Sequence, residues 1–421
     1  MDTLDFARLQ FSVTASIHFA FVSLTLGLVV YLVFIQAAWT ITGKTVYERA
    51  LKFWGRLYLI NYGLGLITGI VMEFQFGMNW SGLTTAFGDL FGPALAMETL
   101  VAFVLEVTML GLWIFGWRTL GRRTHLAVIC LAALTAYASV FWILSANAFL
   151  QHPVGYEMRG GRAHLTDLGA VLGNPSLWDT LAHVVFAALT VGSVFVAGVS
   201  AYHLIKRTDE SGVFRMSLRV SLAVLPVAAY ATVHYGMMQI LVIKETQPLK
   251  LALIEGRTQE ADALRAELGT RLGAEHFLAP DWVGTLFAIM QGTGFALVLV
   301  STAGLVLLIR DWVIRLRLPL YLLVALIPVP FVMVVVGWLV REVGRQPWTV
   351  YGLLLTTDAV SELSPVSAAV SFATFTLVPA VLAVLDYWLL ARYARRGPED
   401  GAFGAPLGTV TREPDPEPMP F

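Results

Sequence analysis

Long apolar stretches, separated by short polar connections, constrain this chain more than any other feature of its sequence. Each stretch has roughly the 20 residues that an α-helix needs to cross the hydrocarbon core of a bilayer. The sequence therefore predicts an all-α polytopic membrane protein with nine transmembrane helices, near residues 10–40, 53–77, 93–117, 124–148, 180–205, 217–243, 282–308, 318–340 and 366–394.

The composition agrees with a chain that is solvated mainly by lipid. Of its 421 residues, 57% are hydrophobic and 14% are charged, which is more apolar surface than a soluble domain can bury. The net charge of −1 argues against nucleic acid as a partner. The single cysteine, Cys130, excludes a disulfide framework, a CxxC metal site and a CxxCH haem attachment. The acidic start MDTLDFARLQF lacks the basic region of a cleavable signal, so the first apolar stretch is expected to remain as a helix.

Basic residues occur in alternate connections between the predicted helices, and this asymmetry sets the orientation. The segment at 78–92, on the opposite side, has no Lys or Arg. Because short cytoplasmic connections are enriched in these residues, we expect the N-terminus outside and the C-terminus in the cytoplasm. The basic residues are Lys44, Arg49, Lys52, Arg118, Arg122, Arg123, Lys206, Arg207, Arg215, Arg219, Arg310, Arg315, Arg317, Arg392, Arg395 and Arg396.

Residues 1–396 form the predicted transmembrane domain, and two longer connections lie on its outer side. The first, 149–179, is rich in turn-forming residues, and the second, 244–281, contains the charge-alternating helical stretch TQEADALRAELGTRLG. The tail 397–421 is rich in Pro, Gly and acidic residues and is predicted to be disordered. GLGLITG at 63–69 has no strand before it, which favours close helix packing over a nucleotide-binding loop.

Several predicted helices carry polar residues that are costly inside a bilayer, and with this orientation they share one outer layer. A His and a Met together are the axial pair of a low-spin haem, whereas a carboxylate or a single His suits a five-coordinate haem that binds a gas. This arrangement of residues fits a redox protein or a proton-coupled membrane protein, and it does not identify the reaction. The residues of the outer layer are His18, Glu98, His183, Met290 and Glu342.

Each of these residues also has a plainer interpretation. A lone membrane histidine often joins two helices by a hydrogen bond, and Met290 alone is typical of packing. Glu342 lies between Arg341 and Arg345, so an interfacial ion pair is an alternative. Glu106 lies outside the layer, about 12 Å deeper than Glu98 by helical rise.

Four motifs carry a resemblance to a known family. They are FWGRLYLINYGLGLITGIVMEFQFGMNW (53–80), LFGPALAMETLVAFVLEVTMLGLWIFGW (90–117), SANAFLQHPVG (145–155) and GWLVREVGRQPW (337–348). On these motifs the chain resembles subunit I of the cytochrome bd-type oxidases, the haem-bearing subunit of a terminal oxygen reductase. The resemblance runs from residue 8 to about residue 397.

The resemblance implies roles for the residues of the outer layer and their neighbours. His183 and Met290 match the ligands of haem b558. His18 and Glu342 match the ligands of two clustered haems, b595 and d (or a third haem b), without an assignment of one residue to one haem. The remaining positions are Glu98 in the same cluster, Arg345 and Trp338 beside it, and Glu106, His125, Ser139 and Asn147 along a route for protons from the cytoplasm.

The implied activity is a quinol:oxygen oxidoreductase of the bacterial cytoplasmic (inner) membrane. Electrons from quinol pass through haem b558 to the haem pair, and oxygen is reduced to water with protons taken from the cytoplasm. Charge is thereby separated without pumping. The implied partners are a second subunit, quinol, oxygen and lipid, and the resemblance leaves open a small single-helix subunit.

The electron donor is the least constrained part of this prediction. QPLKLALIE (247–255) keeps Lys250 and Glu255 of the quinol loop, where Glu255 would accept a proton from quinol. Lys250 would bind a quinone oxygen or, alternatively, form a solvated ion pair with Glu255.

Three positions depart from the family pattern on the donor side. Met237 replaces the usual acid, Ala288 replaces an Arg, and Arg56 replaces a Lys. Two alternatives therefore stay open. One is an oxygen reductase fed by a c-type cytochrome. The other is a haem-free, proton-coupled transporter that uses Glu98 and Glu106 as a relay.

Overall fold

In the computed structural model, the described residues are 3–209, 212–273 and 276–398. Within these ranges nine helical spans are long and apolar enough to cross a membrane, as predicted. The predicted disordered tail lies, from residue 399 onward, outside the described residues. The spans are α1 (Thr3–Thr42), α2 (Thr45–Asn79), α3–η1–α4 (Ser81–Phe115), α5 (Arg122–Gln151), α6–α7 (Leu168–Lys206, of which α7 is Pro175–Lys206), α8 (Val213–Thr246), α11–η2–α12 (Trp282–Arg315, of which α11 is Trp282–Leu308), α13–α14 (Arg317–Val343) and α16 (Pro365–Arg396).

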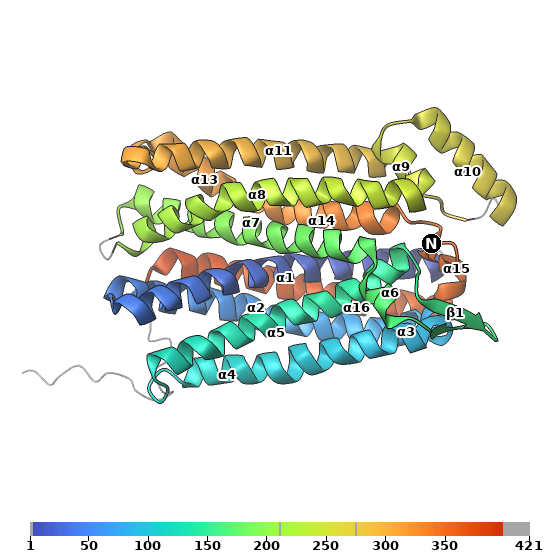
Figure 1. Ribbon diagram of the computed structural model, residues 1–421, viewed down its shortest axis with the longest axis horizontal. Helices are drawn as coiled ribbons and strands as arrows, with labels where there is room; N and C mark the ends of the chain where they lie inside the picture. The colour runs from blue at the N-terminus through green and yellow to red at the C-terminus, as the bar shows by residue number, and fades with distance from the viewer. Residues whose placement is uncertain (1–2, 210–211, 274–275, 399–421) are drawn as a thin grey trace, which may run out of the picture.

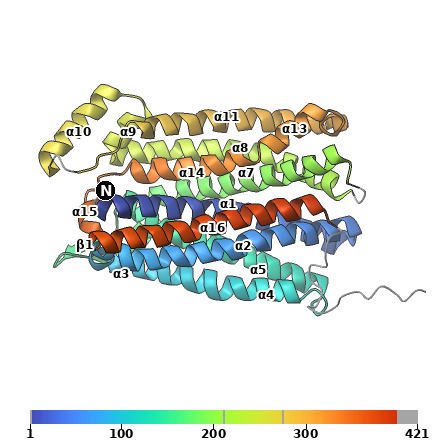
Figure 2. The same ribbon diagram turned by 180° about the vertical axis from the view of Figure 1, so that it is seen from behind.

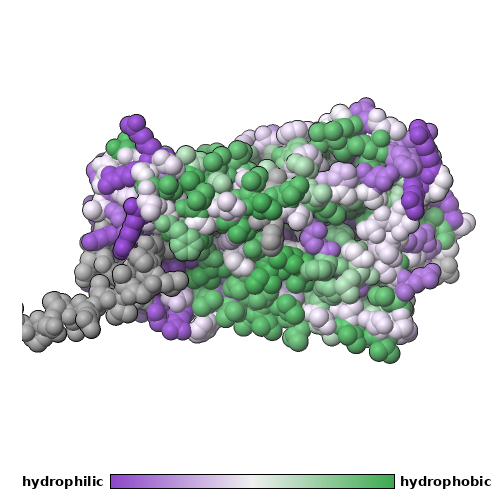
Figure 3. Space-filling view, turned by 90° about the horizontal axis from the view of Figure 1, so that it is seen from below, coloured by the Kyte–Doolittle hydropathy of each residue, from purple (hydrophilic) through white to green (hydrophobic). Residues whose placement is uncertain are grey.

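The spans run side by side along the long axis of the molecule (Figures 1 and 2). The N-terminus lies at one end of the bundle, and α16 ends at the other. Apolar residues cover the middle of the surface and polar residues gather at both ends (Figure 3). This distribution suits a bilayer around the middle of the bundle. The orientation, with the N-terminal end outside, stays a prediction from the basic residues.

The connections with structure of their own lie at the N-terminal end of the bundle (Figure 1). The predicted charge-alternating helix is α10. The β1–β2 hairpin turns at Gly160 and Gly161, whose positive φ angles of 56° and 79° favour glycine. The elements are β1 (Tyr156–Arg159), β2 (Arg162–Leu165), α6 (Leu168–Leu172), α9 (Pro248–Ile254), α10 (Thr258–Leu272), β3 (Trp348–Val350), β4 (Leu354–Leu355) and α15 (Thr356–Ala359).

Two spans differ from their predicted form. The third begins at Ser81, about three turns before the predicted start, and changes to a π-helix over η1 (Leu100–Glu106) before α4 (Val107–Phe115). The eighth is broken between α13 (Arg317–Ala325) and α14 (Pro328–Val343). Pro328 explains the break, because proline cannot donate a backbone hydrogen bond and favours the first turn of a new helix.

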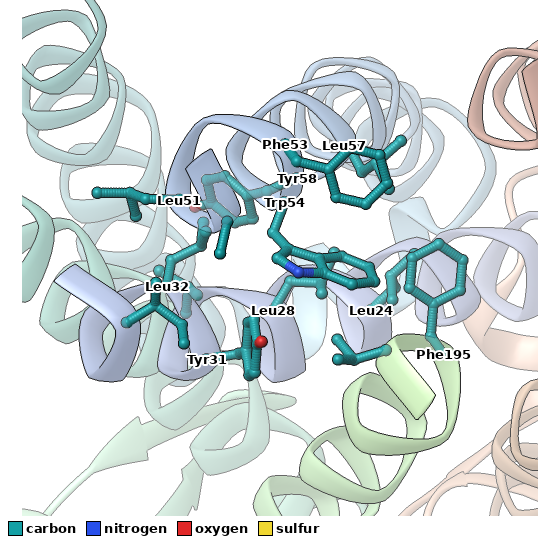
Figure 4. Packing of buried hydrophobic residues seen from close by; sticks show 14 of the residues in the cluster. Leu24, Leu28, Tyr31, Leu32, Leu51, Phe53, Trp54, Leu57, Tyr58 and Phe195 are labelled. Atoms are coloured by element: carbon teal, nitrogen blue, oxygen red, sulfur yellow. The ribbon is translucent and has the colours of Figure 1, made fainter. Parts of the chain in front are cut away.

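Helix α1 lies at the centre of the bundle and packs against α2, α5, α7, α14 and α16. The largest hydrophobic cluster surrounds its C-terminal half. Trp54 of α2 is fully buried there, with Leu28 and Tyr31 of α1 and Phe195 of α7 around its indole ring (Figure 4). Burial of such large rings is the main favourable term in packing. The cluster therefore fixes the arrangement of α1, α2 and α7 on which the polar sites depend.

Glycines allow close approach of helices at two places. A Cβ atom on Gly27 of α1 would lie 2.2 Å from the Ala188 carbonyl oxygen of α7, and Gly192 faces Gly27 across this crossing. In the GLGLITG motif, a Cβ atom on Gly65 would lie 3.0 Å from Phe21 Cβ, and one on Gly69 would lie 3.1 Å from His18 Cε1. The prediction of close packing is confirmed at these glycines of the motif.

Gly27→Ala is expected to lower the free energy of unfolding by about 1–3 kcal/mol, because the added methyl group forces α1 and α7 apart. Gly63→Ala is the matched control, since no described atom beyond its chain neighbours and the adjacent backbone of its own helix lies within 4 Å of its Cβ position. There the greater helix propensity of alanine should leave stability unchanged or slightly raised. Thermal unfolding in detergent, followed by tryptophan fluorescence, measures both. Equal losses of stability in the two variants would show that the close α1–α7 contact does not account for the effect of Gly27→Ala.

Candidate functional site

Glu342 stands in the last turn of α14 at the N-terminal end of the bundle and is 8% exposed. Arg345 Nη2 donates to its Oε2 at 2.6 Å. Asn147 Nδ2 and Gln151 Nε2, both from α5, donate to its Oε1 at 2.9 and 3.3 Å. A buried carboxylate needs such donors to remain ionised. Each oxygen has two lone pairs, so these bonds leave capacity to bind a metal.

Arg341 precedes this carboxylate in the chain but is held by neutral groups. Its Nε donates to Asn147 Oδ1 at 2.6 Å. Its Nη1 donates to Thr180 Oγ1 at 3.0 Å and to Gln239 Oε1 at 3.2 Å, and its Nη2 donates to Ser176 Oγ at 3.4 Å. The ion pair of this helix end is therefore formed by Arg345, and Arg341 ties α14 to α5, α7 and α8.

Lys250 lies in the short helix α9 and is 2% exposed. Its Nζ donates to Gln151 Oε1 and to the Arg341 carbonyl oxygen, each at 3.0 Å. Burial lowers the pKa of the Lys250 ammonium well below its usual value, and the nearby guanidinium groups of Arg341 and Arg345 lower it further. The residue is therefore a buried part of the site and not an exposed side chain.

The alternative of a solvated ion pair between Lys250 and Glu255 is wrong. Glu255 is exposed beyond the end of α9, and Arg257 Nε lies 2.8 Å from its Oε2. The arginine also contacts Glu260. The two residues of the predicted quinol loop therefore lie in different surroundings.

His183 of α7 and Met290 of α11 line one cavity of about 180 Å³ between α7, α8, α11 and α14. His183 Nδ1 donates to the Thr232 carbonyl oxygen at 2.8 Å, which leaves Nε2 with a free lone pair. Glycines keep both side chains accessible, because a Cβ atom on Gly236 would lie 3.1 Å from the His183 ring and one on Gly337 would lie 3.0 Å from Met290 Sδ. A nitrogen and a sulfur ligand thus face one space, as a six-coordinate haem requires.

A second histidine, His18 of α1, also has a hydrogen-bonded Nδ1 and a free Nε2. The Thr68 hydroxyl donates to the Gly65 carbonyl oxygen at 2.7 Å, so it accepts from His18 Nδ1 at 2.9 Å. His18 Nε2 therefore keeps its lone pair, as a metal ligand needs. Gly69, without a side chain, leaves room beside the ring.

Four buried nitrogen donors near α1 and α14 have no protein acceptor among the described residues. They are Gln75 Nε2, Trp80 Nε1, Trp338 Nε1 and Arg345 Nη1. Phe11 connects the two indoles, with ring centroids 5.5 Å from Trp80 and 6.5 Å from Trp338. Each unsatisfied donor costs about 1–3 kcal/mol, and all four need an acceptor. The carboxylates of haem would supply acceptors, so the residues present fit the cofactor.

A carboxyl pair lies between α2, α3 and α5. Ser139 Oγ donates to Glu98 Oε1 at 2.9 Å, and the Glu73 carboxyl group lies beside that of Glu98. Sequence reasoning missed Glu73, although a carboxylate within the predicted 53–77 helix was the available signal. Glu106, at the end of η1, is 5% exposed.

The predicted proton-route residues fall in separate hydrogen-bonded groups. Ser139 joins the carboxyl pair, and Asn147 joins the end of α14. His125 lies near the opposite end of α5, where its Nε2 donates to the Trp113 carbonyl oxygen and its Nδ1 accepts from Gln36 Nε2, each at 2.8 Å. Both ring nitrogens of His125 are therefore engaged.

The fold and these polar groups define a multi-pass membrane protein with buried sites suited to haem. The family model for cytochrome bd terminal oxidase subunit I matches residues 6–276 and 273–398. The chain belongs to the cytochrome bd terminal oxidase subunit I family. This membership disfavours the alternative of a haem-free transporter.

Individual relatives cover almost the whole chain. Cytochrome bd ubiquinol oxidase subunit 1 of Bacillus subtilis (strain 168) is 34% identical over 97% of this chain and 97% of its own length. Cytochrome bd-II ubiquinol oxidase subunit 1 of Escherichia coli (strain K12) is 29% identical over 94% and 97%. A solved bd oxidase structure from Geobacillus thermodenitrificans matches with a TM-score of 0.83 over 94% of this chain and 99% of that one. At 22% identity, this last match shows the fold alone.

Asn147→Ala is expected to lower the free energy of unfolding by about 2 kcal/mol or more, because the side chain donates to one charged group and accepts from another. Ser145→Ala, on the same helix and 3% exposed, is the control, since its hydroxyl donates to the Phe141 carbonyl oxygen of its own helix. The thermal unfolding midpoint in detergent checks both variants. A smaller loss for Asn147→Ala than for the control would contradict the bridging role.

Proposed function

We propose that this chain is the haem-bearing subunit of a terminal oxidase that passes electrons from quinol to oxygen and forms water. The observation that carries the proposal is the single cavity lined both by His183, whose Nε2 keeps its lone pair, and by Met290. These residues would hold the low-spin haem b558. When bound, haem supplies the electron transfer and the oxygen chemistry, and the protein supplies ligands, orientation and charge.

His18 and Glu342 would hold the two clustered haems, b595 and d or a third haem b. Support comes from the free Nε2 of His18 and from the ionised, donor-rich setting of Glu342. Arg345 and Trp338 would donate to the haem carboxylates through their unsatisfied nitrogens. Glu98, with Ser139, would hold a proton within the same cluster.

Protons would come from the cytoplasmic side of the bundle. Glu106, His125, Ser139 and Asn147 are the residues proposed for this route, and their separate groups imply that protons cross gaps between them. Uptake from one side only would separate charge across the membrane. The proposed orientation has the N-terminus outside and the haem sites near the outer surface.

Quinol is the proposed donor, since the two relatives compared are named ubiquinol oxidases. Glu255 is exposed at the surface, where a quinol head group would meet it, and a carboxylate there accepts a proton as electrons leave the quinol. Lys250, being buried, would position the loop against α14. A second subunit, a small single-helix subunit and the bacterial cytoplasmic membrane complete the proposed assembly.

His183→Ala and Met290→Ala should each remove the low-spin haem signal from the reduced-minus-oxidised spectrum and leave the oxygen-reactive haem largely in place. His183 and Met290 together would hold the haem in its low-spin state, so either residue alone would not be sufficient. His234→Ala is the control, because His234 is exposed on α8 and stacks on Tyr230. A normal low-spin spectrum in both ligand variants would refute the assignment.

Glu255→Ala should lower quinol-driven oxygen consumption severalfold, whereas consumption driven by an artificial one-electron donor should survive. Glu260→Ala is the matched control, because Glu260 is equally exposed and contacts the same Arg257. Reduced cytochrome c is tested alongside. Oxygen consumption with cytochrome c but not with quinol would favour a c-type cytochrome as the electron donor. Equal loss of activity with every donor would show that electrons do not enter at this loop.

A further inference from the structure

The cavity that His183 and Met290 share has basic side chains in its wall but no acidic ones. Among the residues that the structure describes, no Asp or Glu lines it, whereas Arg341, Lys250 and His152 do. A guanidinium group is always charged, and its charge is unfavourable in a poorly solvated place unless an anion joins it. The wall of this cavity is therefore suited to a ligand that carries negative charge.

Two helices independently place Arg341 about one turn from the proposed axial ligands, on the side of the N-terminal end of the bundle. On α7, its guanidinium group donates to Thr180, three residues before His183. On α14, Arg341 follows Gly337 by four residues, and a Cβ atom on Gly337 would lie 3.0 Å from Met290 Sδ. Residues at these spacings share a helix face, and the offset is about 5 Å along α7 and about 6 Å along α14.

The protein orients the Arg341 guanidinium group without neutralising it. The four hydrogen bonds described above use four of its five N–H groups, and every acceptor is an uncharged side chain. In the described part of the chain no carboxylate lies within ion-pair distance of Arg341, because Glu342 pairs with Arg345 instead. One N–H group on Nη2 and the whole charge of Arg341 therefore stay available to a ligand.

His152 adds a second polar group to the same wall. It follows the last residue of α5, and its Nδ1 atom is buried without a hydrogen-bond partner among the described residues. Asn174 Nδ2 donates to the His152 carbonyl oxygen at 2.8 Å, and Asn174 Oδ1 accepts from the Ser176 backbone nitrogen at 2.9 Å. Ser176 Oγ in turn accepts from Arg341 Nη2. These contacts hold the end of α5 beside the first turn of α7, where Arg341 is bound.

The chemistry of haem fits this arrangement of groups. A haem carries its carboxylates on one edge of the ring, and Arg341 and His152 lie on one side of the proposed axial ligands. Helix α11 offers no cation of its own beside Met290, since position 288 is alanine. The cation and the unsatisfied nitrogen thus come from α14 and from the end of α5, which is the combination that a carboxylate needs as partner.

We propose that Arg341 and His152 bind a carboxylate of the low-spin haem and that the charge of Arg341 raises the reduction potential of this haem, an inference that rests on the proposed function. Reduction adds one negative charge to the haem, so a fixed cation nearby favours the reduced form. Arg341 thereby makes the low-spin haem a better acceptor of electrons from the donor. Its neighbour Arg345 serves the separate site at Glu342.

The test is a redox titration of the low-spin haem in the complete oxidase, with mediators and without turnover. In Arg341→Gln the ratio of reduced to oxidised low-spin haem at a fixed potential should fall roughly tenfold, the effect of one charge at about 10 Å in a medium of effective dielectric constant about 20. Arg341→Lys keeps the charge and should recover most of this ratio. Arg219→Gln is the matched control, because Arg219 pairs with Asp311 and does not line the cavity.

A second pair of variants tests the contact without removing a charge. His152→Asn keeps a donor nitrogen near the position of Nδ1 and should leave the ratio almost unchanged, whereas His152→Leu should lower it severalfold. Equal ratios in these two variants, an unshifted potential in Arg341→Gln, or a shift confined to the haem at Glu342 would each overturn the inference. A wild-type complex that does not reduce oxygen with quinol would overturn the proposed function, and the predicted shift would still support the contact.

Discussion

The absence of water from the hydrocarbon region is the constraint on which this structure depends. Every backbone donor and acceptor in that region must be paired inside the protein, which leaves long helices as the way to cross. The same constraint applies to side chains, so an ionised or hydroxyl group at depth needs partners from other helices. Helix α1 supplies the common surface, since five other spanning helices pack against it.

The buried charged side chains at the N-terminal end of the bundle are subject to this constraint. The buried guanidinium groups of Arg341 and Arg345, with the buried Lys250 amine, lie around the single Glu342 carboxylate. Such an excess of positive charge is unfavourable in a poorly solvated place unless anionic groups join it. The carboxylates of haem are anionic groups of this kind, so the protein is built to be complete only with its cofactors. The nitrogen donors that lack acceptors lie in the same part of the molecule.

The sequence predicted the parts of this structure that depend on composition along the chain. Nine apolar stretches became nine spans within the described residues, because length and hydropathy alone decide whether a helix crosses a bilayer. The early start of α3 was missed, since its first turns mix apolar with small polar residues and resemble a loop. The spacing of Lys250 and Glu255 also suggested an ion pair that the structure does not contain.

The rest depends on contacts between distant residues. Helix α9 ends at Ile254, so Glu255 lies beyond it while Lys250 turns inward toward α5 and α14. The tautomer of His183 depends on a carbonyl group from α8 that no sequence pattern marks. Family resemblance supplied ligand positions that hydropathy could not. It gave no hint that Glu73 of α2 lies beside Glu98 of α3, which requires two helices to meet.

The hydrogen bond from Lys250 to the Arg341 carbonyl oxygen also joins two separate parts of the structure. It fastens α9, the first helix of the loop after α8, to the backbone one residue before Glu342. Gly344 lies against the same lysine, where a Cβ atom would come within 2.7 Å of Lys250 Cε. The Lys250 side chain therefore joins the loop directly to the end of α14. A shift of α9 would act on the peptide next to the Glu342 carboxylate without passing through the hydrophobic cluster around Trp54.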